Sequence, residues 1–359
     1  MSEFRVNSIT NQDGSAGPQV CGVSTFSGKS GVQIPSGPTD FRRQDGGGRG
    51  RGILFVNDQP STKTLNKIEI ATTGNADDFG DSMVSKNFPS YFASSTRGIF
   101  AGGQPSVSPY YISGIEYVIT SSGGGSNDFG DLSQGSSNLI ADRGDSAGSN
   151  DSTRGLIAGG RTPGDGGGRN SIDFVTMAST GDSVEFGQLA QGRTAFRGGM
   201  ANGTRAIFAG GYIQSQDPAT FVKIIDTVNV QSKGEATKFG ELTTLRARLA
   251  NTSNSIRGLT MGGRPDSPSN PTNIIEFITM STEGNAQDFG DLTNSVMIHA
   301  ACSSRTRAVQ TGGNNGSAAV NTMQFVTIST TGNATDFGDM TVAESGNSAI
   351  SDVNGGLSQ

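Results

Sequence analysis

Charged residues that recur at a fixed place in the sequence are the first candidates for chemistry. One arginine precedes each of six short apolar runs such as TRGIFAGG, namely Arg51, Arg97, Arg154, Arg205, Arg257 and Arg307. An acid follows a Phe-Gly pair at Asp81, Asp131, Glu241, Asp291 and Asp339, and Gln188 stands at the equivalent place in a further copy. Because paired carboxylates hydrolyse glycosidic bonds, a carbohydrate-active enzyme is one possible function.

The regular recurrence of these charges favours a structural role instead. An active site needs residues that break a repeat, whereas these residues occupy equivalent places in successive units. We expect each arginine to bind a carboxylate or turn carbonyls within or between units. On this interpretation Arg257→Ala breaks a buried pair and costs about 3 kcal/mol or more.

The Phe of the Phe-Gly pair recurs in the same way, at Phe79, Phe129, Phe186, Phe239, Phe289 and Phe337. A ring wedged between two units buries much apolar area, so we expect a structural role here too. Phe289→Ala is then expected to cost roughly 3–5 kcal/mol. The alternative is a row of exposed rings that stack on sugars.

The remaining candidates for a catalytic, cofactor or metal site are weak. His299 is the single histidine and lies in an apolar stretch, MIHAAC, which favours a core or channel position over catalysis. One imidazole cannot form a His-rich metal site. The glycine runs Gly46–Gly50 and Gly164–Gly168 lack the Lys-Ser or Lys-Thr of a phosphate-binding loop. Acids at Asp77, Asp78 and Asp81 fit a solvated turn better than a cation site. We therefore predict no catalytic residue, cofactor or metal.

Composition excludes further classes of function. The net charge is −6 with no block of Lys or Arg, which argues against nucleic-acid binding. The start, MSEFRVNSIT, does not resemble a secretory signal, and no run approaches the length of a membrane span, so no membrane insertion is expected. Two cysteines, Cys21 and Cys302, do not imply a disulfide framework.

The chain is built from repeats of about 50 residues. In each unit an apolar run predicts a strand buried on both faces, and an alternating segment such as Ile275–Thr279 predicts a second strand. Gly284-Asn285 predicts a turn with positive φ before a third strand around Phe289. The tract Arg246–Ser253 fits a fourth strand. Four strands in a unit of this length indicate a propeller blade.

These repeats predict an all-β, six-bladed propeller over residues 49–359, preceded by an extended N-terminal docking arm over residues 1–48. The blades are expected at about 49–82, 96–133, 153–190, 204–243, 256–293 and 306–341. The segment 342–353 should complete the first blade beside Arg51–Val56, which closes the ring without an exposed edge. Recognition is expected in loops of variable length, namely Gln104–Ser113, Ser133–Ser152, Arg161–Asn170, Tyr212–Thr220 and Arg264–Asn273.

The pattern resembles kelch repeats. The family's paired glycines match Gly102-Gly103, Gly159-Gly160, Gly210-Gly211, Gly262-Gly263 and Gly312-Gly313. Its acidic position matches Glu69, Glu116, Asp173, Asp226 and Glu276, with Gln324 as the exception. The family's Tyr and Trp are replaced, the Trp by the Phe of Phe-Gly. The resemblance implies a propeller and does not specify a function.

The sequence motifs of the blades and of the arm (VNSITNQDGSAGPQV) resemble those of virion structural proteins of tailed phages that infect marine cyanobacteria. This resemblance implies a non-enzymatic tail, tail-fibre or capsid-exterior protein, localised to the virion and present in multiple copies in a symmetric assembly. Its partners would be other virion proteins through the arm, and a glycan or protein of the host surface through the loops. The alternatives are a cellular kelch-type interaction module and a carbohydrate-active propeller enzyme.

Overall fold

The computed structural model describes residues 50–56, 63–105, 111–133, 141–162, 168–213, 220–266 and 270–353. All of them belong to the unit Arg42–Gln359. The predicted arm, residues 1–48, lies outside the described residues, as do parts of the five predicted recognition loops. None of the described segments is a helix long and apolar enough to cross a membrane.

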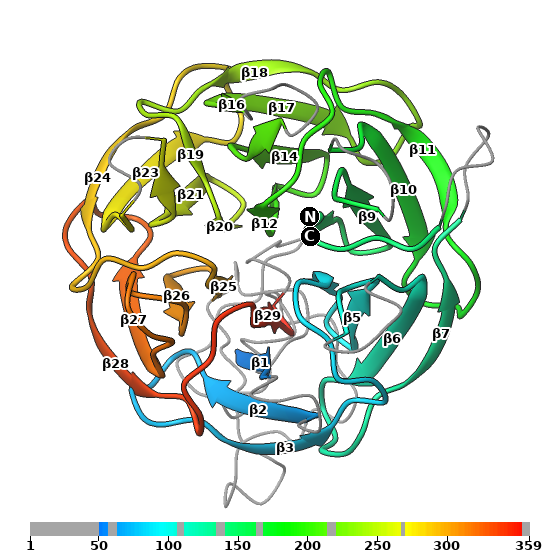
Figure 1. The fold of residues 1–359 in the computed structure, drawn as a ribbon, viewed down its shortest axis with the longest axis horizontal. Coiled ribbons are helices and arrows are strands. Elements are labelled where there is room, and N and C mark those ends of the chain that lie inside the picture. The colour runs from blue at the N-terminus through cyan, green and yellow to red at the C-terminus, as the bar shows by residue number, and fades with distance from the viewer. Residues whose placement is uncertain are drawn as a thin grey trace, which may run out of the picture. The chain divides into compact units, whose positions relative to one another are not determined.

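Six antiparallel sheets stand around a central axis as the blades of a β-propeller (Figure 1). From the axis outward, blade 1 holds β29 (Ser348–Ser351), β1 (Arg51–Phe55), β2 (Thr64–Glu69) and β3 (Asp77–Asp81). Blade 2 holds β4 (Ser90–Ala93), β5 (Arg97–Ala101), β6 (Gly114–Ile119) and β7 (Asn127–Asp131). Blade 3 holds β8 (Ala147–Asn150), β9 (Arg154–Ala158), β10 (Ser171–Thr176) and β11 (Val184–Gln188).

The other three blades repeat this order. Blade 4 holds β13 (Met200–Ala201), β14 (Arg205–Ala209), β17 (Ile224–Asn229) and β18 (Thr237–Glu241). Blade 5 holds β20 (Leu249–Ser253), β21 (Arg257–Met261), β23 (Ile274–Thr279) and β24 (Gln287–Asp291), with β12 (Phe196–Arg197) added in parallel to β20. Blade 6 holds β25 (Ala300–Ser303), β26 (Arg307–Thr311), β27 (Thr322–Thr327) and β28 (Thr335–Asp339). Two small ribbons, β15 (Tyr212–Ile213) with β16 (Thr220–Phe221) and β19 (Arg246–Ala247) with β22 (Arg264–Pro265), lie outside the blades.

Side-chain patterning explains the position of each strand. The apolar runs form the second strand of each blade and are buried on both faces, as Ile99, Phe100 and Ala101 of β5 show with 0% exposure. The alternating segments form the third strand of each blade, and the segments that contain the Phe-Gly pair form the outer, fourth strand. Flat, apolar second strands sandwiched between neighbours are what a ring of packed sheets requires.

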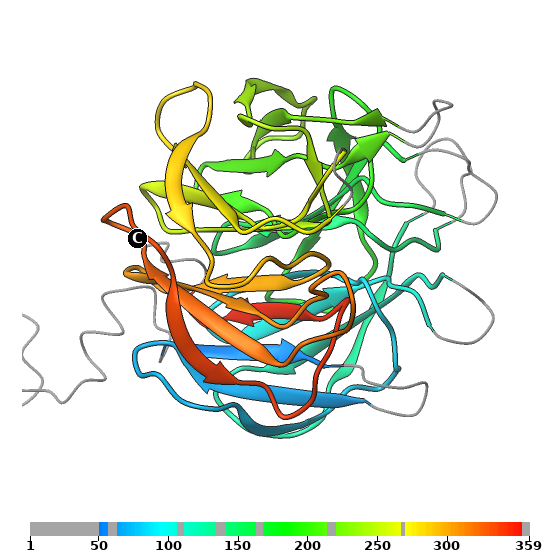
Figure 2. The ribbon, with the colours of Figure 1, turned by 60° about the vertical axis from the view of Figure 1, so that its left-hand side comes forward.

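The ring is closed by the C-terminal segment, as the sequence predicts. β29 pairs antiparallel with β1, with Ile350 opposite Ile53, and it lies beside β1 in both views (Figure 1 and Figure 2). The Asp352 carboxylate accepts hydrogen bonds from the backbone N–H groups of Gly50 and Arg51, each at 2.9 Å. Closure therefore joins the two ends of the described chain within one sheet, so that β1 is paired on both sides.

Three local predictions were wrong. The predicted strand Arg246–Ser253 is interrupted at Arg248, which has a left-handed φ of 57°. The predicted loop Ser133–Ser152 contains β8, the inner strand of blade 3. Neither Gly284 nor Asn285 has a positive φ. This turn uses glycine for a close backbone contact between blades, which sequence patterning does not distinguish from a positive φ.

The contact between neighbouring blades is made by two glycines. The N–H of Gly284 in the blade 5 turn donates to the carbonyl of Phe239 on β18 at 3.0 Å, and Ala286 donates to Glu241 at 2.9 Å. A Cβ added to Gly240 would lie closer than 3.0 Å to the Gly284 carbonyl. The same contact recurs at every junction, as Gly80 with Gly124, Gly130 with Gly181, Gly187 with Gly234, Gly290 with Gly332 and Gly338 with Gly74. The outer strand's edge is thus covered by the next blade's turn, and only glycine fits there.

We expect Gly240→Ala to lower the free energy of unfolding by about 1–3 kcal/mol, because the new methyl group overpacks the junction. Gly284→Ala is the matched control from the same junction, since an added Cβ there has no neighbour within 4 Å. It should change stability by no more than about 0.5 kcal/mol. Urea denaturation of the two variants measures the difference, and equal effects would contradict the glycine contact.

Candidate functional site

The six predicted arginines begin the second strand of each blade and bind the neighbouring blade. Each guanidinium donates from Nη1 to a backbone carbonyl of the turn that follows the third strand there. The pairs are Arg51–Thr120, Arg97–Met177, Arg154–Val230, Arg205–Ser281, Arg257–Ile328 and Arg307–Ile70. We call this end of the propeller the turn face. Because the last pair joins blade 6 to blade 1, the set runs around the whole ring.

In four blades the arginine also covers an aromatic ring that meets a second ring edge-on. The Arg257 guanidinium lies 4.8 Å from the centre of the Phe277 ring, which meets Phe289 edge-on at 6.0 Å. Equivalent stacks are Arg97–Tyr117–Phe129, Arg154–Phe174–Phe186 and Arg307–Phe325–Phe337. All six rings of the Phe-Gly pairs are between 2% and 5% exposed. Since they are buried, these rings cannot form a sugar-stacking surface.

Arg257 binds turn carbonyls of the next blade, which is one of the two kinds of partner expected for the repeated arginines, and among the described residues it does not belong to a buried ion pair. Arg257 is half-buried and its described acceptors are the carbonyls of Ile328 and Ser329, at 3.0 and 2.9 Å. Solvent screens part of this interaction. We accordingly expect its loss to cost about 1–2 kcal/mol, toward the lower end of the range of about 1.5–3 kcal/mol for hydrogen bonds to charged groups.

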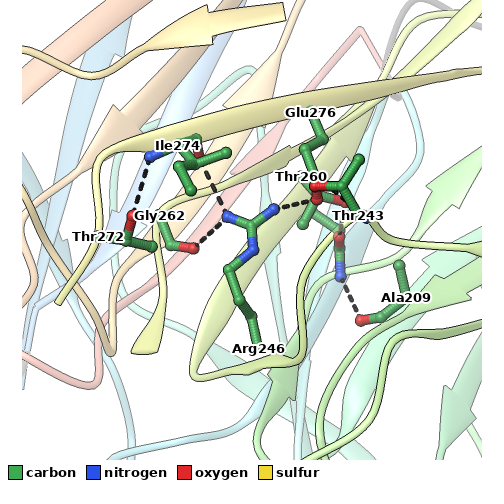
Figure 3. A network of polar contacts seen from close by, with 9 residues as sticks. Ala209, Thr243, Arg246, Thr260, Gly262, Thr272, Ile274 and Glu276 are labelled. Carbon is green, nitrogen blue, oxygen red and sulfur yellow. Dashed lines mark hydrogen bonds and ion pairs between the residues drawn. The ribbon is translucent and has the colours of Figure 1, made fainter. Parts of the chain in front are cut away.

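A different set of basic residues forms the buried ion pairs. They are Lys86–Glu116, Arg143–Asp173, Arg193–Asp226 and Arg246–Glu276, in blades 2 to 5. In blade 5, Arg246 pairs with Glu276 and donates to the carbonyls of Gly262 at 2.7 Å and Ile274 at 3.1 Å (Figure 3). Burial lowers the pKa of the Arg246 guanidinium, and the Glu276 carboxylate opposes that shift. Each pair ties the segment entering an inner strand to the third strand of the same blade.

Blades 6 and 1 replace both members of this pair. In blade 6 the basic position holds Val296 and the acidic position Gln324, whose Oε1 accepts bonds from the N–H and hydroxyl of Thr293 at 2.6 and 2.7 Å. In blade 1 the same positions hold Glu344 and Asn66. Burying a carboxylate without a nearby cation costs folding free energy. The blades that lack the basic residue therefore also have an uncharged residue, Gln324 or Asn66, at the acidic position.

The acidic position assigned to Glu69 was therefore wrong. Asn66 lies opposite Asp78 between β2 and β3, just as Glu276 lies opposite Asp288 between β23 and β24. Glu69 ends β2 with a side chain that is 50% exposed. The sequence did contain a signal for the missed pairs, because a basic residue stands two positions before each interruption of the inner tract in blades 2 to 5.

The acids that follow the Phe-Gly pairs are not brought together. Asp81, Asp131, Glu241, Asp291 and Asp339 each end the outer strand of a different blade. Hydrogen bonds from Lys223 and Lys238 lower the pKa of Glu241 to about 2. The two carboxylates of a glycosidase must flank one bond, and acids on separate outer strands do not meet that requirement.

At the opposite end, which we call the loop face, six left-handed residues form a closed ring of hydrogen bonds. They are Phe88, Asp145, Ala195, Arg248, Ile298 and Gly346. Each N–H donates to the carbonyl of the equivalent residue in the preceding blade at 2.6–3.2 Å, and Phe88 donates to Gly346 to complete the circle. Apart from Gly346 they are the only non-glycine residues of the described chain with positive φ. Strain in the backbone is thus concentrated at the loop-face end of the axis.

The inner strands line a small hollow of about 60 Å³ that is partly open to solvent. Near the ring, Arg197 is 3% exposed and donates to the carbonyls of Asn347 at 2.8 Å and Gly346 at 3.3 Å. Its guanidinium also lies 4.7 Å from the Phe88 ring. Arg197 therefore crosses the axis from β12 to the segment that enters β29, and it reinforces closure.

His299 is a core residue. It follows the left-handed Ile298 as Leu249 follows Arg248, and its side chain lies against Gly262 and Gly313. Burial and the nearby Arg197 charge lower the pKa of the imidazole to about 3. The ring is neutral at pH 7 and sits where another blade has leucine, which suits packing better than proton transfer.

Within the described ranges, no three His, Cys, Asp or Glu side chains come together as a metal site. No protein-family model matches the chain, and no curated protein matches it. The fold and the arrangement of the repeated residues define a six-bladed β-propeller. The resemblances to kelch repeats and to phage virion proteins rest on sequence motifs alone.

Arg246→Ala leaves Glu276 buried without its cation and should cost about 3–5 kcal/mol in a chemical denaturation experiment. The double variant Arg246→Val with Glu276→Gln copies blade 6 and should recover most of that loss. Arg257→Ala, with its smaller expected effect, is the control. A loss for Arg246→Ala no larger than for Arg257→Ala would refute the assignment of the buried pair.

His299 should make stability depend on pH. Its pKa is lower in the folded than in the unfolded chain, so the contribution is complete above about pH 6.5 and is lost as the pH falls toward about 3. Binding one proton on unfolding corresponds to a slope of up to about 1.4 kcal/mol per pH unit. Denaturation of His299→Leu across this range should give a shallower pH dependence than the parent protein. Parallel curves would show that His299 does not titrate on unfolding.

Proposed function

We propose that the protein is a non-enzymatic virion structural component of a tailed phage, docked through its N-terminal arm and presenting the loop face to neighbouring subunits or to the host surface. One observation carries the scaffold part of this proposal. The residues that repeat with the blades are engaged in blade-to-blade contacts, while the described ends of the connections of variable length lie at the loop face. Rigid scaffolds with variable loops are suited to recognition.

The virion part of the proposal is supported by the resemblance of the blade and arm sequences to phage virion structural proteins. The same fold also serves cellular interaction modules, so fold alone does not select between them. An enzymatic role has less support, because the acids at the repeated inner position, such as Asp173, Asp226 and Glu276, are paired with buried cations. A buried carboxylate held by a guanidinium is a poor general acid.

Mass spectrometry of purified particles from the virus that encodes the chain should detect it intact. Deleting Met1–Gly46 should leave the propeller folded, with the thermal midpoint of the parent protein, and abolish incorporation into particles. Incorporation of the truncated chain at the parent level would contradict docking through the arm. Absence of the chain from purified particles would instead favour the cellular interaction module.

A further inference from the structure

Three arginines on the loop face differ from the arginines of the blade junctions. Arg161, Arg248 and Arg264 are half-buried, and their guanidinium groups donate no hydrogen bond within the described part of the chain. Nε of Arg264 is fully buried without an acceptor among those residues. In contrast, Arg97 and Arg154 donate to carbonyls of the next blade. A guanidinium without an acceptor has capacity to bind an anion.

The backbone brings these three side chains to one arc of the loop face. Arg161 pairs with Gly144, next to the left-handed Asp145, and Arg264 pairs with Ala247, next to Arg248. The left-handed residues of these segments are consecutive members of the hydrogen-bonded ring, because Arg248 donates to Ala195 at 2.6 Å and Ala195 donates to Asp145 at 3.1 Å. The small side chain of Ala195 separates the two charged segments.

Aromatic rings lie in the same arc. Tyr212 pairs with Thr194, directly before Ala195, and stacks on Phe221 with ring centres 5.8 Å apart and planes 27° apart. The Arg264 guanidinium lies 5.6 Å from the centre of the Phe221 ring. Half-buried rings beside unpaired guanidinium groups provide an apolar surface next to an anion-binding group.

One carboxylate accompanies the arginines. Asp145 interacts electrostatically with Arg197 and, within the arc, with Arg161 and Arg248, and burial raises its pKa against their influence. A carboxylate among arginines accepts hydrogen bonds from hydroxyl groups, which a simple anion does not have.

We propose that this arc, formed by Arg161, Tyr212, Phe221, Arg264, Arg248 and Asp145, binds a saccharide that carries a carboxylate or sulfate group. The guanidinium groups bind the acidic substituent, the aromatic rings cover the apolar face of the sugar, and Asp145 accepts hydroxyl hydrogen bonds. The inference rests on the proposed role of the loop face in recognition and specifies its ligand.

The residues of this arc differ from those at the equivalent positions of other blades, which supports a role in binding. The positions equivalent to Arg161, Tyr212 and Arg264 hold Gln104 and Asn314 in blades 2 and 6. The left-handed ring likewise varies in side chain while its backbone geometry is constant. A long polyanion such as a nucleic acid fits less well, because the cations are few and the chain carries a net charge of −6.

Isothermal titration of the purified full chain with an oligogalacturonate, a sulfated galactose oligosaccharide and a neutral galactose oligosaccharide tests this inference. At least one anionic oligosaccharide should bind, more tightly than the neutral one and more weakly at high salt. Arg161→Ala and Arg264→Ala should each weaken binding at least about tenfold, the effect of one lost charge-assisted hydrogen bond. Tyr212→Ala should weaken it too, while Tyr212→Phe retains the ring and should bind normally.

Arg305→Ala is the matched control, because it removes an exposed arginine from the turn face. It should leave affinity unchanged, and circular dichroism should show that each variant is folded. Equal affinity for the neutral sugar, no binding of either anionic sugar, or an equal loss in Arg305→Ala would overturn the inference. Displacement by a glutamate-rich peptide at the same concentration would point to an acidic protein instead. Because the titration uses isolated protein, its failure is distinguishable from absence of the chain in particles.

Discussion

The glycine-to-carbonyl contact between neighbouring blades is the constraint on which the rest of the structure depends. At each junction the Gly of a Phe-Gly pair lies against the carbonyl of a turn glycine, with two backbone hydrogen bonds beside it. This contact sets the distance between outer strands and covers their edges. It also positions the Phe rings, which in four blades meet edge-on the aromatic ring that an arginine covers. The two most conspicuous sequence motifs of the repeat, Phe-Gly and Gly-Asn, therefore form the two sides of the interface between neighbouring blades.

The buried charged residues of the inner part of the blades do not follow one pattern in all six blades. Blades 2 to 5 keep a buried cation beside a buried carboxylate, whereas blades 6 and 1 carry Gln324 and Asn66 at the acidic position. Both solutions satisfy the same backbone donors, as the bonds from Thr243 to Glu276 and from Thr293 to Gln324 show. In blades 5 and 6 the residue at the acidic position accepts a backbone hydrogen bond, and in blade 5 it forms an ion pair as well.

The sequence predicted what depends on local periodicity. Blade number, the strand pattern around Ile275–Thr279 and closure by residues 342–353 follow from spacing and apolar patterning, and the structure confirms them. The predictions that were wrong concern strand register and contacts between residues that lie far apart in the sequence. Glu69 lies three residues after Asn66, the true equivalent of Glu276; the buried ion pair is formed by Arg246 and not by Arg257; and Arg248 interrupts the tract that was predicted as one strand. The arc on the loop face lacks a repeat, so no periodicity could reveal it.

The central claim is that all six junctions are equivalent, including the one between blade 6 and blade 1, where the turn and the outer strand come from opposite ends of the sequence. Hydrogen exchange of single amides tests it most directly. Gly74 and Ala76 donate from blade 1 to Phe337 and Asp339 of blade 6, as Gly332 and Ala334 donate to Phe289 and Asp291 within the continuous chain. The account predicts similar protection for the two sets of amides. Exchange of Gly74 and Ala76 at the rate of an exposed turn, with Gly332 and Ala334 protected, would contradict a closed ring.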